Sequence, residues 1–375
     1  MKSPETPSIH GESTRQHATR STVTGMRSRS LRTRLATVTA ALAAATTLGT
    51  AGPAHAHATV NASPSHACSP AVSIDGFSDA LDKTTYEGTF VGNFSALAVN
   101  RDGSLAAVSD RSALFTLDAR TLRPTGVVPL ADDKGAELDS EGLVVDRDGT
   151  LLVSSEKEPS VRRYDREGRL LGGSLPVPEA LRVAPAGRAV TNGTFEGLTL
   201  LPGGRTLLAS MEYALSGDSA GIVRFQTWDR GRGQDFRLSD QYGYRADSGL
   251  GVVETAALPD GRLLVLERGF TSGVGNTVRL YLADPRHATD TSGVENLTGQ
   301  ADVRLVKKTL LTDLVTCPTL GATAKQPQPN PLLDNIEGMT ITGYGSGGLR
   351  VLLVSDDNQN PAQTTRFYRL NVRLP

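Results

Sequence analysis

The sequence predicts an all-β protein, a β-propeller of four-stranded blades whose ring is closed by an N-terminal strand. Two observations support this fold class. One hairpin pattern recurs along the chain, and its copies begin at Ser95, Glu141, Glu196, Glu254 and Glu337. The copies start 46, 55, 58 and 83 residues apart. Repeats of this length, each made of several short strands, are typical of propeller blades.

Each copy contains two apolar strands joined by a turn with glycine, as in "SEGLVVDRDGTLLVSSEK" and "FEGLTLLPGGRTLLASMEY". Asp-Gly and Gly-Gly favour tight hairpin turns because they tolerate positive φ. A third apolar strand follows every hairpin, for example "ALFTLDA" and "VRLYLAD". The first four copies leave room for a fourth strand as well.

The last copy ends with its third strand at the C-terminus. The stretch "IDGFSDALDKTTYEGTF", which precedes the first copy, is therefore expected to supply the missing outer strand and close the ring. We count five blades. The 83-residue interval, which contains "CPTLGATAKQPQPNPLLDN", holds either a long insertion or a sixth blade.

The first 56 residues predict a secretory signal peptide, with Met26 as an alternative natural start. Met26 is followed by the arginine-rich "RSRSLRTR", a short apolar run, and Ala54-His55-Ala56, which is typical of a signal peptidase site. The apolar run is too short to span a bilayer. We expect a secreted protein with a flexible segment over 57–74 and one propeller domain over 75–375.

Cleavage after Ala56 leaves 32 basic and 38 acidic residues, a net charge of −6. This charge argues against a nucleic-acid partner and favours bound cations. The two cysteines, Cys68 and Cys317, both remain after cleavage. In an exported protein they predict one disulfide, the alternative being two free thiols.

The hairpins bring acidic residues to one end of each blade. Residues equidistant from the turn of an antiparallel hairpin face each other. Counting outward from each turn pairs Ser95 with Asp110, Glu141 with Glu156, Glu196 with Glu212, Glu254 with Glu267, and Glu337 with Asp356. In four blades a glutamate is therefore expected opposite a second acid.

The first strand of a propeller blade lines the central channel, so the four glutamates should converge there. Carboxylates so close together must be protonated, pair with basic groups or bind a cation. Oxygen ligands alone favour Ca²⁺, ahead of Mg²⁺ or Mn²⁺. The candidate ligands are Glu141, Glu196, Glu254, Glu337, Asp110, Glu156, Glu212, Glu267 and Asp356. The alternative is structural: these acids would accept hydrogen bonds from backbone amides of the adjacent blade.

The residues after the second-strand acids include three basic ones. They are Arg111, Lys157, Tyr213, Arg268 and Asp357. The basic residues either form ion pairs with their acidic neighbours or hold a phosphate or carboxylate of a substrate. The segment "SDDNQN" at 355–360 adds Asp357 and Asn358 as oxygen donors, unless it is only a turn.

The motifs "SEGLVVDRDGTLLVSSE", "FEGLTLLPGGRTLLASMEY", "NIEGMTI" and "VLLVSDDN" together resemble the phytase-like family called esterase-like activity of phytase. The resemblance covers residues 75 to 373 and implies a propeller fold and a phosphoester or ester hydrolase activity. The Glu of the family's EG motif corresponds to Glu141, Glu196, Glu337 and, with Thr255 in place of Gly, Glu254. The SDR motif corresponds to Ser109-Asp110-Arg111. The first copy departs from the pattern, because Ser95-Ala96 stands where Glu-Gly is expected.

A metal-activated water is the expected nucleophile. Cleavage leaves only His57, His66 and His287, and no G-x-S-x-G elbow exists, which argues against a Ser-His-Asp system. We expect Glu196 to take part in catalysis and Arg111 or Arg268 to stabilise developing charge.

Two alternatives belong to other classes. One is a non-catalytic propeller with a structural metal and a rim that binds a ligand or partner, and the other is a lactonase-like propeller with one Ca²⁺ in its channel. The expected substrate is a small molecule, such as a phosphoester. We expect no membrane span and a monomeric protein.

Overall fold

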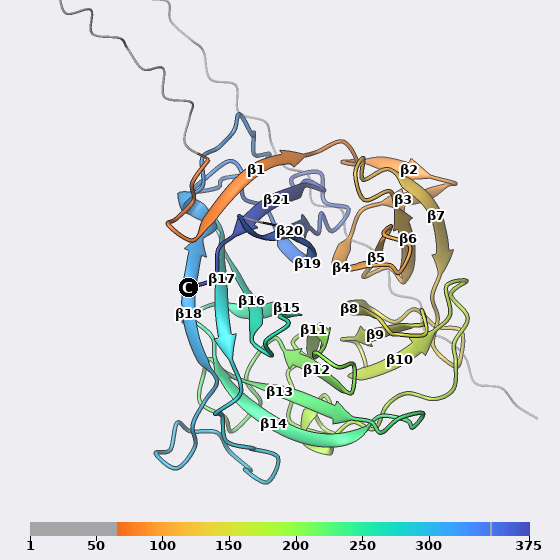
Figure 1. Cartoon of the computed structure of the whole chain (residues 1–375), viewed down its shortest axis with the longest axis vertical. Coiled ribbons are helices and arrows are strands. Elements are labelled where there is room, and N and C mark those ends of the chain that lie inside the picture. Colours follow the sequence, from red (N-terminus) through yellow and green to blue (C-terminus); the bar gives the residue numbers. More distant parts are fainter. Residues whose placement is uncertain (1–65, 346) are drawn as a thin grey trace, which may run out of the picture. The chain divides into compact units, whose positions relative to one another are not determined.

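The computed structural model describes residues 66–345 and 347–375, so the predicted signal peptide lies outside the described residues. Five sheets surround a central axis, and the innermost strands β4, β8, β11, β15 and β19 face that axis (Figure 1). Each innermost strand contacts the next, and β19 contacts β4 to complete the ring. The propeller is thus confirmed with five blades, and the long interval before residue 337 holds no sixth blade in the part described.

Within each blade the strands follow one another outward from the axis and are antiparallel. Blade 1 consists of β4 (Phe94–Val99), β5 (Leu105–Ser109), β6 (Ala113–Leu117) and β7 (Pro124–Pro129). Blade 2 consists of β8 (Ser140–Val145), β9 (Leu151–Ser155) and β10 (Ser160–Tyr164). Blade 3 consists of β11 (Phe195–Leu200), β12 (Thr206–Met211), β13 (Ile222–Asp229) and β14 (Arg237–Arg245). Blade 4 consists of β15 (Gly251–Ala257), β16 (Leu263–Thr271), β17 (Gly275–Asp284) and β18 (Lys307–Asp313).

Blade 5 combines both ends of the folded chain. Its strands are β19 (Ile336–Gly345), β20 (Gly348–Ser355), β21 (Phe367–Val372) and, outermost, β1 (Val72–Ser78). The predicted closure by an N-terminal strand is confirmed, and β1 begins before residue 75, where the sequence places the start of the domain. The hairpin β2 (Thr84–Tyr86) and β3 (Thr89–Val91) connects β1 to blade 1.

Blade 2 departs from the expected four strands because its outer segment is irregular. The amides of Leu171 and Leu175 donate to the carbonyls of Arg163 and Val161 on β10, at 2.7 and 2.8 Å. The segment that contains Leu171 and Leu175 therefore lies where a fourth strand would lie, but it forms no regular ladder of hydrogen bonds with β10. A short 3₁₀ helix, η1 (Glu179–Leu181), follows this segment.

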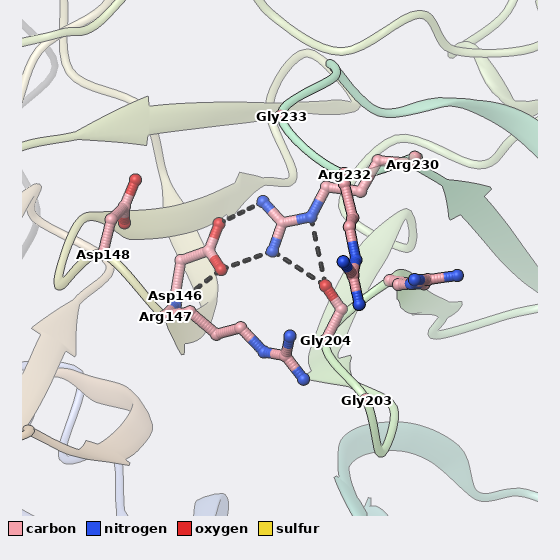
Figure 2. Close-up of a pocket in the computed structure, with 10 residues that line it drawn as sticks. Asp146, Arg147, Asp148, Gly203, Gly204, Arg230, Arg232 and Gly233 are labelled. Carbon is pink, nitrogen blue, oxygen red and sulfur yellow. Dashed lines mark hydrogen bonds and ion pairs between the residues drawn. The ribbon is translucent and has the colours of Figure 1, made fainter.

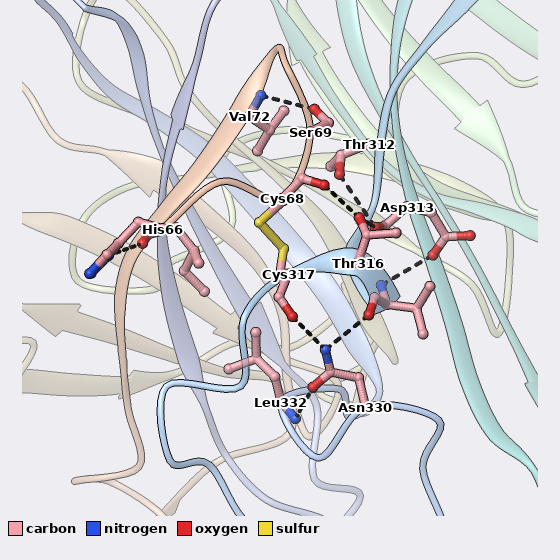
Figure 3. Close-up of a disulfide and its surroundings, with 12 residues drawn as sticks. His66, Cys68, Ser69, Val72, Thr312, Asp313, Thr316, Cys317, Asn330 and Leu332 are labelled. Atoms are coloured by element: carbon pink, nitrogen blue, oxygen red, sulfur yellow. Dashed lines mark hydrogen bonds between the residues drawn. A yellow bond between two sulfur atoms is a disulfide. The ribbon is translucent and has the colours of Figure 1, made fainter. Parts of the chain in front are cut away.

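A disulfide between Cys68 and Cys317 fastens the ring closure (Figure 3). Cys68 precedes β1, while Cys317 follows the 3₁₀ helix η2 (Leu314–Thr316) at the end of β18. Thr316 also donates its hydroxyl to the carbonyl of Cys68 at 2.6 Å. The predicted disulfide is confirmed, and it joins the outer strand of blade 5 to blade 4.

The apolar core lies between adjacent blades. At the junction of blades 1 and 5, Phe94 packs edge to face against Phe115 and Phe367, with ring centroids 5.5 and 5.9 Å apart. All three rings are almost fully buried. No helix within residues 66–345 and 347–375 is long and apolar enough to cross a membrane.

The glycine of the EG motif is required by close contact between innermost strands. A Cβ on Gly197 would lie 2.6 Å from the backbone nitrogen of Thr255 and 2.9 Å from the Cα of Glu254. A Cβ on Gly142 would lie 2.5 Å from the carbonyl oxygen of Glu196. The motif therefore positions its glutamate at a point where neighbouring blades nearly touch.

Candidate metal centre

Each innermost strand contains a β-bulge near its start, at the end where the acidic residues lie. The ladder skips one residue between Phe94 and Ala96, and one between Ile336 and Gly338. It skips two residues in blades 2 and 3, where Glu141-Gly142 and Glu196-Gly197 stand. Bulges bend a strand and redirect side chains. Ser95, Glu141, Glu196 and Glu337 are thereby removed from regular cross-strand pairing.

The bulges correct the cross-strand pairing expected from the sequence. Glu156 does not face Glu141; its amide donates to the carbonyl of Asp139 at 3.0 Å. In the same way the amide of Glu212 donates to Thr194, and that of Asp356 to Asn335. Counting from the turns failed because the count assumed an uninterrupted ladder. The acids still gather at one end of the axis, but as a cluster and not as opposed pairs.

Three glutamates of this cluster lie close enough to share one cation. Glu156 directly follows β9, the second strand of blade 2. In blade 3, Glu196 is the second residue of β11 and Glu212 directly follows β12. Each offers one carboxylate oxygen, and these oxygens all lie within 4.8 Å of one another. All three residues are buried. We call them the glutamate triad.

Five more carboxylates interact electrostatically with the triad or with one another. They are Asp110, Asp139, Glu141, Glu337 and Asp356. Together with the triad they form the axial acid cluster. Blades 1, 2, 3 and 5 all contribute to it.

Burial and mutual repulsion raise the pKa values throughout the axial acid cluster. Burial first, and then the charges of neighbouring acids, raise the pKa of Glu156, of Glu212 and of Asp110 to about 7 in each case. The pKa values of Glu141 and Glu196 rise well above their usual range for the same two reasons. At neutral pH the cluster therefore binds protons unless a cation replaces them.

Among the residues described, the one basic side chain that forms ion pairs with two acids of the cluster is that of Arg268, which is half-buried. Its guanidinium lies 3.0 Å from Glu337 and 3.7 Å from Glu212. Arg268 pairs with Gly251, so it occupies the place that Asp110, Glu156, Glu212 and Asp356 hold in the other blades. The bulge of this blade falls on Val253, which likewise stands where the other copies have Ser95 or a glutamate.

The predicted ligands Glu254 and Glu267 of blade 4 consequently lie outside the glutamate triad. Glu254 pairs with Leu266, and its carboxylate accepts the amides of Thr255 and Leu198 at 2.8 and 3.3 Å. This is the structural role offered above as the alternative, since Leu198 belongs to the adjacent blade. Glu267 accepts hydrogen bonds from Lys308 and Tyr244, both at 2.6 Å. The expected pairing of Glu254 with Glu267 is wrong because the bulge shifts the ladder by one residue.

The other predicted residues surround the axial acid cluster. Arg111 is largely exposed, and its Nε lies 3.6 Å from Asp110. Lys157 is exposed as well. Asp357 is fully buried, forms an ion pair with Lys83 and accepts the amide of Asn93 at 3.0 Å. Asn358 is exposed, and its amide donates to Asp356 at 2.8 Å.

Sequence reasoning missed the residues that face the second-strand acids. Asp139 faces Glu156, and Asn335 donates its side-chain amide to Glu337 at 2.9 Å. The signal was in the sequence: Asn93, Asp139, Thr194 and Asn335 each stand two residues before the bulged position. Lys83, by contrast, reaches Asp357 from the closure segment, which has no counterpart in the repeats.

The fold and this cluster define the class of protein: a five-bladed propeller with a carboxylate site at one end of its axis. The chain belongs to the Phytase-like family, described as esterase-like activity of phytase, whose profile matches residues 89–359. A protein of Arthroderma benhamiae, named as an uncharacterized secreted protein, is 31% identical over 120 residues. That match covers 26% of this chain and 23% of the relative, so the chain spans less than a quarter of its length.

Two solved structures share a distant likeness. A gluconolactonase of Xanthomonas campestris is 14% identical, with a TM-score of 0.38 over 76% of this chain and 73% of that one. A second structure, whose description also names a gluconolactonase, has the same identity and TM-score over 75% of each chain.

Proposed function

We propose that this protein is a secreted hydrolase of ester or phosphoester bonds that works with a divalent cation, Ca²⁺ in the first place. The observation that carries the proposal is the glutamate triad, Glu156, Glu196 and Glu212, whose carboxylate oxygens lie within 4.8 Å of one another. Family membership supports the ester-hydrolase class. The signal-like N-terminus, the disulfide and the secreted relative support export.

The oxygen ligands present at the site fit a hard cation. Carboxylate and amide oxygens surround the site, and Ca²⁺ accepts six to eight such ligands. Asn93 Oδ1 is buried and accepts no hydrogen bond within the described part of the chain, and Asp110 Oδ1, which is also buried, has only the ion pair with Arg111 Nε at 3.6 Å. Buried oxygens without partners are costly, and a cation would satisfy them. Glu156, Glu196 and Glu212 would hold the ion. Asn93, whose backbone carbonyl accepts the amide of Asp110, and Asp110 itself are candidates for further oxygen ligands.

The side chains around the cluster suit hydrolysis. A bound divalent cation would supply Lewis acidity and a more acidic water. Asp110, with its pKa raised by burial to about 7, can hold or release a proton near neutral pH. Arg268, fixed between Glu337 and Glu212, directs positive charge into the site. Such a fixed charge stabilises negative charge that develops on a reacting ester.

A neighbouring pocket can receive an anionic part of the substrate. It begins at Lys157, the residue after Glu156, and has a volume of about 420 Å³. Lys157, Arg162 and Arg182 line it. Arg162 is buried, and its one side-chain hydrogen bond among the described residues goes to Ser160. The other donors of its guanidinium are therefore available to a phosphate or carboxylate.

The test compares metal binding with turnover. Purified protein is passed over a chelating resin, and hydrolysis of p-nitrophenyl phosphate, p-nitrophenyl acetate and a sugar lactone is measured with and without Ca²⁺. We expect Ca²⁺-dependent turnover of an ester that Glu196→Gln abolishes and Glu254→Gln, outside the triad, retains. If Ca²⁺ raises the melting midpoint but no substrate is hydrolysed, the metal is structural and the proposal fails. Turnover of the lactone alone would assign the protein to the lactonase-like alternative.

A further inference from the structure

A second basic pocket lies at the opposite end of the hairpins from the axial acid cluster. It has a volume of about 550 Å³ and lies between the turns of blades 2 and 3 and the loop after β13 (Figure 2). Asp146 marks its position, because it follows β8, whereas Glu141 lies near the start of that strand. A six-residue strand is about 17–20 Å long, so the two sites are separate.

The floor of this pocket is held together by Arg230. Its guanidinium donates to both oxygens of Asp146, at 2.6 and 2.5 Å, and to the carbonyl of Gly204 at 2.8 Å (Figure 2). Arg230 also stacks on Phe236, 4.3 Å from the ring centroid. Because these contacts connect two turns and a loop, the pocket is fixed before any ligand binds.

One of the two acidic residues that line the pocket is already neutralised. Asp146 accepts hydrogen bonds from Arg230 and from Arg163, the latter at 2.8 Å. Burial alone would raise the pKa of Asp146, but these two arginines lower it to about 2. The only other acid that lines the pocket, Asp148, is exposed and accepts the amide and hydroxyl of Thr150.

Three further arginines that line the pocket have no such partner. The guanidinium groups of Arg147, Arg205 and Arg232 form no hydrogen bond or ion pair within the described residues. They come from three separate segments: the turn of blade 2, the turn of blade 3 and the loop after β13. Figure 2 shows Arg147 and Arg232 extending toward the space beside Gly204. Three positive charges thus surround one cavity in a protein of net negative charge.

Glycine residues allow the arginine side chains to lie close to the backbone of the pocket. Gly203 and Gly204 have φ values of +92° and +63°, which side chains disfavour. A Cβ on Gly204 would lie 3.0 Å from Cζ of Arg147. Gly231 and Gly233 flank Arg232 and add no side chain of their own to the opposite wall.

We propose that this pocket binds a compact anion with several phosphate charges, such as pyrophosphate or the diphosphate group of a small molecule. Guanidinium groups bind phosphate oxygens in a bidentate manner, and three from different directions match an anion with oxygens on all sides. The volume lies within the range of small-molecule sites. The inference does not depend on the proposed hydrolase activity, since the axial acid cluster contributes nothing to it.

Isothermal titration calorimetry with pyrophosphate and with inorganic phosphate tests the proposal. The protein is freed of metal on a chelating resin, because a soluble chelator is itself an anion and would compete. We expect pyrophosphate to bind more tightly than phosphate. Arg147→Gln and Arg232→Gln should each weaken binding about tenfold, the value of one charge-assisted hydrogen bond.

The matched control is Arg123→Gln with Arg373→Gln, which removes two exposed arginines elsewhere on the surface. Glu196→Gln separates the two sites and should leave pyrophosphate binding unchanged. Absence of binding, equal weakening in the control, or loss of binding in Glu196→Gln alone would each overturn the proposal. Because the guanidinium groups of Arg147 and Arg232 form no hydrogen bond or ion pair within the described residues, their variants should melt at nearly the same temperature as the unaltered protein.

Discussion

Glu156→Gln should stabilise the metal-free protein, although it removes a buried residue of the glutamate triad. Glu156 has its pKa raised from 4.5 to about 7, first by burial and then by neighbouring acids. The folded chain therefore binds this proton more tightly than the unfolded chain does. It follows that the free energy of unfolding falls as pH rises from about 4.5 to about 7 and stays low above that range.

The magnitude follows from the same shift. One pKa unit corresponds to about 1.4 kcal/mol, so the full shift corresponds to about 3 kcal/mol at pH 8. Glutamine retains part of the cost of burial but carries no charge, so we expect a gain of about 1–3 kcal/mol. Well below pH 4.5, where Glu156 is protonated in both the folded and the unfolded state, the two proteins should differ little.

Urea unfolding of metal-free protein at pH 5 and pH 8 measures this difference. Glu267→Gln is the matched control, because Glu267 is also buried but is paired with Lys308 at 2.6 Å. Removing one partner of a buried ion pair should destabilise the protein at pH 8, by about 3 kcal/mol. The two substitutions should thus have opposite signs. If Glu156→Gln is destabilising at pH 8 and at pH 5 alike, the triad is a set of structural hydrogen-bond acceptors and the reasoning is refuted.

Three further outcomes are expected. Ca²⁺ at a hundred times its dissociation constant should stabilise the protein by about 2.7 kcal/mol at pH 8. The stabilisation should be smaller at pH 5, because protons compete with Ca²⁺ for the acids whose pKa is raised. Equal shifts of the melting midpoint at both pH values would contradict this. Gly197→Ala should destabilise by about 3 kcal/mol or more because its Cβ would meet the backbone of the adjacent blade, whereas Gly173→Ala, which meets nothing within 4 Å, should be nearly neutral in the same denaturant titration. Joint replacement of Cys68 and Cys317 by alanine should lower the free energy of unfolding by about 4 kcal/mol, since the disulfide closes a loop with a sequence separation of 249 residues. If the calorimetric melting midpoint stays unchanged, the closure strand β1 is held by its other contacts.

The repeats predicted the architecture well because hairpin signals are local. Glycine at the turn and alternating apolar residues define each blade, and the missing outer strand had to come from the N-terminus. The disulfide followed from the presence of two cysteines in a chain with a predicted secretory signal. The number of blades was also correct, since the long interval before Glu337 forms η2 and loops and no extra sheet.

The detailed site could not be predicted because it depends on bulges. A single skipped residue changes which side chains face each other, and no residue type in the hairpin marks that skip. Glu254 illustrates the consequence: by sequence it aligns with the EG glutamates, whereas by register it aligns with the glycines Gly142, Gly197 and Gly338 that follow them. Its side chain therefore enters the channel at another level and binds backbone amides.

The displaced register of blade 4 also explains how a repeated scaffold can form one asymmetric site. Five equivalent blades would direct the same acid toward the axis and create a ring of like charges with no internal counterion. Blade 4 contributes Val253 and Arg268 at the two equivalent positions, so one sector of the ring is apolar and basic. Arg268 draws Glu337 and Glu212 toward itself, while Glu156 and Glu196 have no basic side chain within ion-pair distance among the described residues. The two triad glutamates without a basic partner, Glu156 and Glu196, thus lie in blades 2 and 3, whereas the third, Glu212, lies 3.7 Å from Arg268. If the triad binds a cation as proposed, Arg268→Met should change where the cation binds more than whether it binds.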